Sequence, residues 1–360
     1  MKSKKSKLRV RYSAILGIIV FLLIGVIFVG IAKPFYKEEK KDVPPVQQEE
    51  EKKEDDIKTE PVKPEVQIVD VKSNTRPYAV MINNIGAARP YHTGLQKAYM
   101  VYEIIVEGGI TRYMALFKDT YPEVLGSVRS ARPYYIDYAM ENDAYYIHWG
   151  GSSQALKEIK ELSINDVDGL NTGKPYFFRQ KLPVSLEHTG FVNLKEMSKL
   201  VSGKSWRKTA EQSLLLNYSA TNIDLEKHEN KVAAQKIDLK YSGSYVTNYV
   251  YDEASNVYKQ SVNNKEHKDY VTNEQYTVKN IITYQVENHT IGNYGRQALT
   301  NIGSGKGYYI TEGYAIPITW EKKTREGQTK YRYLDGTEIT VNDGNTWIHI
   351  VPTSGKISIS

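Results

Sequence analysis

An uncharged run of 20 residues, SAILGIIVFLLIGVIFVGIA at positions 13–32, constrains this 360-residue chain more than any other feature. At a rise of 1.5 Å per residue, a helix of this length spans about 30 Å, the thickness of the hydrocarbon core of a bilayer. Residues 1–12 carry six basic side chains and no acidic one. Because basic flanks stay in the cytoplasm, the pattern predicts an uncleaved, single-pass signal anchor with the rest of the chain extracytoplasmic. A cleaved signal peptide, whose apolar region is usually about 7–15 residues, is the alternative.

Charge and cysteine content narrow the classes of function. The net charge of +6 comes from the basic tail alone, because residues 33–360 contain equal numbers of basic and acidic side chains. Such a folded part has no overall field that attracts nucleic acid, so no nucleic-acid partner is expected. The sequence contains no cysteine. It therefore offers no thiol for a lipid and no disulfide, and burial alone must stabilise an extracytoplasmic fold.

Composition divides the chain after the anchor into three regions. Residues 33–75 are rich in charge, Pro and Gln and poor in apolar residues, which indicates a disordered linker. Residues 76–235 mix strand-like and helix-like segments, which is typical of an α/β layered domain with a mixed sheet. Residues 236–360 contain short alternating strands between Asn, Asp, Gly and Ser turns, which predicts a mostly antiparallel β domain. Helices are expected at 133–140, 153–162 and 193–201.

The segment VYEIIVEGGITRYMALF, residues 101–117, predicts a β-hairpin with Gly108 and Gly109 as a two-residue turn. That turn would place Glu103 opposite Met114. One face would then be a core face made of Tyr102, Ile104, Val106, Tyr113, Ala115 and Phe117. The other face would carry Glu103, Glu107 and Arg112. On one strand the two glutamates would lie about 13 Å apart, too far for the paired carboxylates of a glycosidase, so cross-strand ion pairing is expected.

Several long segments resemble the YerB-like family, a group of uncharacterised surface lipoproteins of Gram-positive bacteria. RPYAVMINN, LQKAYMVYEIIVEGGITRYMALF, GSVRSARPYYIDYA and YIHWGGSSQAL resemble the N-terminal domain of that family. GYAIPITWEKK and YLDGTEITVNDGNTWIHIVP resemble its C-terminal domain. The resemblance covers roughly residues 76 to 355 and implies a two-domain surface protein, but the family has no established catalytic residues to transfer. This chain departs from the family in lacking a lipobox cysteine, so a membrane-spanning anchor would take the place of the lipid.

Two of these segments carry the candidate binding site. In GSVRSARPYYIDYA, Ser130 lies where a helix N-cap belongs, and Arg129 and Arg132 supply forked donors suited to carboxylate or phosphate. In YIHWGGSSQAL, two glycines free the backbone before a serine that caps a second helix. Ligands of open α/β sheets lie beyond the carboxyl ends of strands, so the two turns are expected to converge on one anion. The predicted ligand-binding residues are Arg129, Ser130, Arg132, Gly150, Gly151, Ser152 and Ser153, supported by Glu103, Glu107, Arg112 and His148. The alternative is that the serines only cap helices and the arginines pair with Glu103 and Glu107.

Two functions from different classes follow from these motifs. The first is a non-catalytic binding protein for a partner protein or for an envelope anion, such as a cell-wall polymer rich in phosphate or carboxylate. The second is an envelope hydrolase in which Ser152 is the nucleophile and His148 or His188 the base, although no G-x-S-x-G elbow is present. The seven histidines are scattered without metal-ligand spacing, so no metal and no cofactor are expected.

Overall fold

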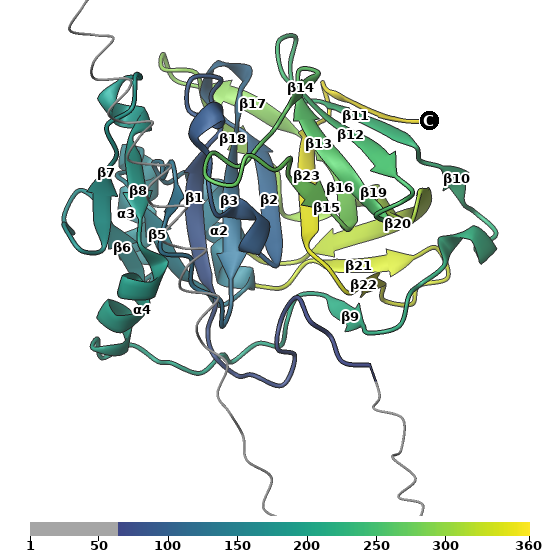
Figure 1. Ribbon diagram of the computed structural model, residues 1–360, viewed down its shortest axis with the longest axis horizontal. Coiled ribbons are helices and arrows are strands. Elements are labelled where there is room, and N and C mark those ends of the chain that lie inside the picture. The colour runs from purple at the N-terminus through teal and green to yellow at the C-terminus, as the bar shows by residue number, and fades with distance from the viewer. Residues whose placement is uncertain (1–63) are drawn as a thin grey trace, which may run out of the picture. The chain divides into compact units, whose positions relative to one another are not determined.

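The computed structural model describes residues 64–360, which belong to one compact unit (Figure 1). The predicted cytoplasmic tail, the membrane anchor and the linker up to residue 63 lie outside the described residues. Within residues 64–360, no helix is both long enough and apolar enough to cross a membrane.

Strands dominate the described residues, which contain three α-helices. The helices are α2 (Pro133–Glu141), α3 (Ser153–Glu161) and α4 (Leu194–Ser202), close to the three predicted ranges. An eleven-stranded central sheet has the order β10 (Val232–Ala233), β20 (Tyr314–Lys322), β19 (Gly303–Thr311), β16 (Asn280–Val286), β23 (Thr346–Pro352), β2 (Met100–Ile105), β3 (Thr111–Phe117), β1 (Tyr78–Asn83), β5 (Tyr145–His148) and β6 (Asp166–Asp168), with β21 (Lys330–Tyr333) on β20.

Four smaller sheets complete the fold. A six-stranded antiparallel sheet has the order β14 (Lys265–Glu266), β13 (Val257–Val262), β12 (Val246–Asp252), β11 (Lys236–Lys240) and β24 (Lys356–Ile359), with β15 (Thr277–Val278) on β13. The others pair β17 (Asn288–Ile291) with β18 (Arg296–Leu299), β22 (Thr340–Asn342) with β9 (Asn217–Ser219), and β4 (Leu125–Gly126) through β8 (Gly190–Val192) with β7 (Phe177–Arg179). The predicted mixed α+β class, with antiparallel β structure toward the C-terminus, is confirmed.

The central sheet joins the two ranges that the sequence divides into an α/β and a β domain. Strand β23, near the C-terminus, pairs in parallel with β2 on one side and with β16 on the other. In Figure 1 the yellow β23 accordingly lies beside the green β16. Backbone hydrogen bonds therefore run from residues 100–104 directly to residues 346–350.

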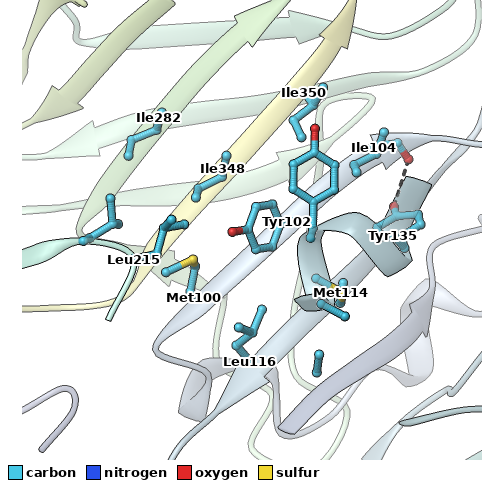
Figure 2. Close-up of a cluster of buried hydrophobic side chains, with 14 of the residues drawn as sticks. Met100, Tyr102, Ile104, Met114, Leu116, Tyr135, Leu215, Ile282, Ile348 and Ile350 are labelled. Carbon is cyan, nitrogen blue, oxygen red and sulfur yellow. Dashed lines mark hydrogen bonds between the residues drawn. The ribbon is translucent and has the colours of Figure 1, made fainter. Parts of the chain in front are cut away.

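Both faces of the central sheet are buried. On one face, side chains of β2, β3, β16 and β23 pack with α2, as Figure 2 shows for Met100, Ile282 and Ile348. The Tyr135 hydroxyl of α2 donates to the Arg112 carbonyl over 2.6 Å and lies 3.2 Å from the Ile104 carbonyl, which fixes the helix over the hairpin. Figure 2 shows the contact with Ile104. On the other face, apolar side chains of the six-stranded sheet and of α4 form a second core.

The predicted register of the β2–β3 hairpin is wrong by one residue. Glu103 lies opposite Tyr113 rather than Met114, because the connection spans residues 106–110 and closes with a hydrogen bond from the Val106 N–H to the Ile110 carbonyl. A slip of one residue moves side chains to the opposite face. The six residues predicted as one core face therefore divide between the two cores, with Tyr102 in one and Tyr113 in the other.

The ordered fold begins before residue 76, where the linker was expected to end. Val69 is buried, and the Asp343 carboxylate accepts hydrogen bonds from the backbone N–H groups of Gln67 and Ile68. The last part of the predicted linker, residues 64–75, is thus attached to the same unit as the strands.

Candidate functional site

The two turns that were expected to converge lie side by side. The Trp149 N–H donates to the Arg129 carbonyl over 3.1 Å, and the Ala131 N–H donates to the Gly150 carbonyl over 2.9 Å. The Ser130 hydroxyl adds a 3.0 Å hydrogen bond to the Trp149 carbonyl. Helices α2 and α3 both begin at this corner, so the structure brings the two predicted turns together.

The two helix starts differ in their caps. Ser152 is the N-cap of α3, and its hydroxyl accepts a hydrogen bond from the Ala155 N–H, whereas Ser153 is the first helical residue. The sequence predicted Ser130 as the N-cap of α2, and this prediction is wrong. Arg132 occupies that position without a side-chain capping bond, because Pro133 is the first residue of the helix and the Ser130 hydroxyl is bonded to Trp149.

The arginines at this corner have carboxylate partners. Arg132 binds Glu107 through two hydrogen bonds of 2.6 and 3.0 Å, and Arg112 lies 3.7 Å from the same carboxylate. Burial opposes ionisation of Glu107, but Arg132 and Arg112 outweigh it and lower the pKa of that carboxyl. Arg129 instead pairs with Glu187 over 2.8 Å. The expected ion pairing therefore holds for Arg132 and Glu107, and the anion site at this corner stays a prediction.

Glu103 is not part of this corner. Its carboxylate is fully buried and accepts hydrogen bonds from the hydroxyls of Thr111 and Thr247. The ring of His349 lies 3.0 Å from its second oxygen. Glu103 thus belongs to the polar contacts between the central sheet and the six-stranded sheet, and its expected pairing with an arginine is wrong.

The hydrolase alternative requires Ser152 to contact a histidine. The Nδ1 atom of His148 lies 2.8 Å from the Gly150 carbonyl, and its Nε2 atom lies 3.0 Å from Asp166. His188 contacts Asn83 and Glu187. In residues 64–360 neither histidine is hydrogen-bonded to Ser152, whose hydroxyl accepts the capping bond of α3. The geometry gives this alternative no nucleophile–base pair.

A different concave surface lies on the outer face of the six-stranded sheet. We call it the lysine hollow; its volume is about 470 Å³. Its lining includes Lys236, Asp238 and Lys240 of β11, Lys356 and Ser358 of β24, and Gly243, Ser244, Asn248, Asn263 and Asn264. Side chains of β11 alternate, so Ile237 and Leu239 enter the core while the three charged side chains face outward.

Two lysines of the hollow are directly opposed. Lys240 pairs in register with Lys356, whereas Lys236 lies 3.3 Å from Asp238. Within the described part of the chain, neither Lys240 nor Lys356 forms an ion pair with a carboxylate. Like charges directly opposite one another on a sheet destabilise the pairing. Strand β11 thus pairs with the edge strand β24 despite this repulsion.

Sequence reasoning missed this hollow. The alternation in KIDLK, residues 236–240, indicates a strand with charged side chains on one face, so the signal for β11 was present. The opposing lysine is 116 positions later along the chain and becomes visible only with the pairing of β11 and β24. As for metals, residues 64–360 contain no group of three His, Cys, Asp or Glu side chains placed to hold an ion.

Comparisons with known proteins agree with the resemblance found in the sequence. A family model described as "Protein of unknown function (DUF3048) N-terminal domain" matches residues 65–207, and its C-terminal counterpart matches residues 237–348. A protein of Bacillus subtilis (strain 168) named "Putative lipoprotein YerB" is 30% identical over 291 residues, which cover 79% of this chain and 84% of that protein. The crystal structure of YerB from Bacillus subtilis matches with a TM-score of 0.67 at 28% identity and covers 79% of this chain and 94% of that chain. Two family models and a relative aligned over most of both chains show that this protein belongs to the DUF3048 family, the family of YerB.

Proposed function

We propose that this chain is a membrane-anchored, extracytoplasmic binding protein without catalytic activity, and that its ligand is a phosphate-bearing component of the cell envelope. The name of the relative YerB describes a lipoprotein, which supports a location at the outer side of a membrane. The 360 residues include no cysteine that could carry a lipid. The proposal therefore assigns the anchoring role to the apolar run at 13–32, with the N-terminus in the cytoplasm.

The observation that carries the binding role is the opposed pair Lys240 and Lys356 in the lysine hollow. A bound anion would remove the repulsion between the two ammonium groups. An ammonium group is a compact point charge and a common partner of phosphate. The proposal therefore favours phosphate as the anionic group.

The predicted corner at Arg129 and Arg132 is a weaker place for this anion. A ligand there would have to displace Glu107 from its two hydrogen bonds with Arg132, or Glu187 from Arg129. At the lysine hollow, Lys240 and Lys356 have no carboxylate to displace within residues 64–360. For this reason the proposal assigns the anion to the lysine hollow.

Replacing both opposed lysines is expected to weaken binding strongly. For a Lys240→Gln/Lys356→Gln variant of the full chain in detergent micelles, we expect the dissociation constant for poly(glycerol phosphate) to rise about 30-fold. This corresponds to about 1 kcal/mol per lysine near an anionic surface. Isothermal titration calorimetry at constant ionic strength measures the change.

The matched control removes the same charge elsewhere. Lys160 and Lys181 are exposed and lie outside the hollow, so Lys160→Gln/Lys181→Gln should bind like the wild type. The double variant of the hollow should be at least as stable as the wild type, because the repulsion between its two lysines is gone. Unchanged affinity in that stable variant would refute the proposed site.

A further inference from the structure

A second hollow adjoins the lysine hollow at the end of the sheets where several turns meet. We call it the turn hollow; its volume is about 510 Å³. Four turns line it. The β2–β3 turn contributes Gly108 and Gly109, and the β11–β12 turn contributes Ser242 and Gly243. The β17–β18 hairpin contributes Asn288, Thr290, Gly295 and Gln297, and the β23–β24 turn contributes Ser354 and Gly355. Both family-model ranges thus contribute to its walls.

We call the three hollows, which share lining residues, the row. Lys240 and Gly243 line both the lysine hollow and the turn hollow. Gln297 lines the turn hollow and also a smaller hollow of about 180 Å³ beside α2 and α3. The two larger volumes each lie within the range of about 300–1,000 Å³ typical of small-ligand sites. A ligand that filled both would have to be extended.

The chemistry of the lining changes along the row. Lysines lie at one end, whereas the turn hollow offers mainly hydroxyl and amide side chains with exposed glycine backbone. Gln297 bonds across the hairpin to Asn288 and Thr290, over 2.6 and 3.0 Å, which holds these side chains in place. A Cβ atom built on Gly108 or Gly243 would meet no atom within 4 Å, so the backbone at both glycines faces open space. Neutral hydrogen-bonding groups of this kind suit the hydroxyl groups of a polyol.

We infer that the ligand is an extended polyol chain linked by phosphodiesters, which lies along the row with phosphates on the lysine hollow and hydroxyl-bearing units in the turn hollow. This inference rests on the proposed function. It adds that two hollows act together, so that affinity depends on the length of the ligand. Linked contacts of this kind raise affinity by about 10²–10⁴-fold without any new type of contact.

The length dependence can be measured on the full chain in detergent micelles. Calorimetric titrations would compare glycerol phosphate oligomers of about two and about twelve units, with inorganic phosphate as the smallest probe. We expect the longer oligomer to bind about 100-fold more tightly per molecule than the shorter one. Equal affinity for the two would overturn the inference and leave the proposed function standing. No binding of any phosphate probe would refute the proposed function itself.

A longer oligomer could bind more tightly because it occupies both hollows or merely because it carries more phosphate charges. A bulky side chain placed between the two hollows distinguishes these explanations. Gly243→Trp should collapse the ratio between the two affinities toward one, because the indole would stand where the hollows join. Gly173→Trp is the matched control: Gly173 is exposed, lies outside the row and also has no atom within 4 Å of a built Cβ. That variant should keep the full ratio. A full ratio in Gly243→Trp would overturn the inference.

Discussion

Lowering the pH from about 6.5 to 5 is expected to reduce the free energy of unfolding by about 3–4 kcal/mol, because two buried histidines must remain neutral. His92 and His267 are buried, and their ring nitrogens lie 2.8 Å apart. Burial lowers the pKa of His92 to about 3 and the pKa of His267 well below its usual value. The facing charge of Arg89 also lowers both, whereas Asp269 acts in the opposite direction on His92.

The sign of this effect follows from proton uptake. In the unfolded chain both histidines titrate near pH 6.5, so between pH 6.5 and about 3 the unfolded state binds protons that the folded state does not. The stabilisation that the two neutral histidines provide is complete above pH 6.5. It is lost as the pH falls toward the pKa values that the two histidines have in the folded state. Urea unfolding at a series of pH values measures the slope.

A variant without the two titrating rings provides the control. His92→Asn/His267→Gln should lose most of the slope between pH 6.5 and 5, whatever its absolute stability. Carboxyls with lowered pKa, such as Asp143 and Asp269, contribute mainly below about pH 4 and so outside this window. An equally steep slope in the variant would show that other groups cause the acid sensitivity.

Breaking the buried ion pair between Glu141 and Lys322 is expected to cost about 3–5 kcal/mol of stability. The Lys322 ammonium lies 2.8 Å from the Glu141 carboxylate, and both side chains are fully buried. Tyr102 and Thr329 also donate hydrogen bonds to Glu141. Lys322→Met would leave this carboxylate buried without its counter-charge. Because Glu141 belongs to α2 and Lys322 to β20, the loss would also weaken the attachment of the two family-model ranges to each other.

Two comparisons separate this effect from ordinary loss of a side chain. The double variant Glu141→Gln/Lys322→Met should recover much of the lost stability, since no unpaired charge stays buried. The ion pair of Lys195 and Glu123 is exposed to solvent, so Lys195→Met should be nearly neutral in the same denaturation experiment. A loss in Lys322→Met as small as that in Lys195→Met would contradict the assigned role.

Local signals in the sequence predicted the helices well. Pro133 and Ser152 mark the starts of α2 and α3, and these starts depend only on a few neighbouring residues. The hairpin register could not be obtained in the same way. Both faces of β2 and β3 are buried, so burial does not distinguish Tyr102 from Tyr113, and the register depends on how the chain passes through residues 106–110.

Pairings between distant residues account for what could not be predicted at the candidate sites. Arg129 pairs with Glu187, which lies 58 positions later in the chain. Glu187 follows β7, and no local sequence pattern predicts where that strand lies in the fold. Lys240 meets Lys356 because β24 returns to pair with β11 at the C-terminus. The composition of the chain indicated neither pairing. Both bear on where an anion could bind, because Glu187 occupies Arg129 whereas Lys240 and Lys356 face each other.

The most direct test of the proposed function is lysine footprinting of the full chain in detergent micelles, with and without poly(glycerol phosphate). Limited acetylation followed by mass spectrometry reports the reactivity of each lysine. We expect the polymer to protect Lys240 and Lys356 strongly and to leave Lys160 and Lys181 as reactive as before. Binding of the polymer with Lys240 and Lys356 still fully reactive would contradict the proposed function.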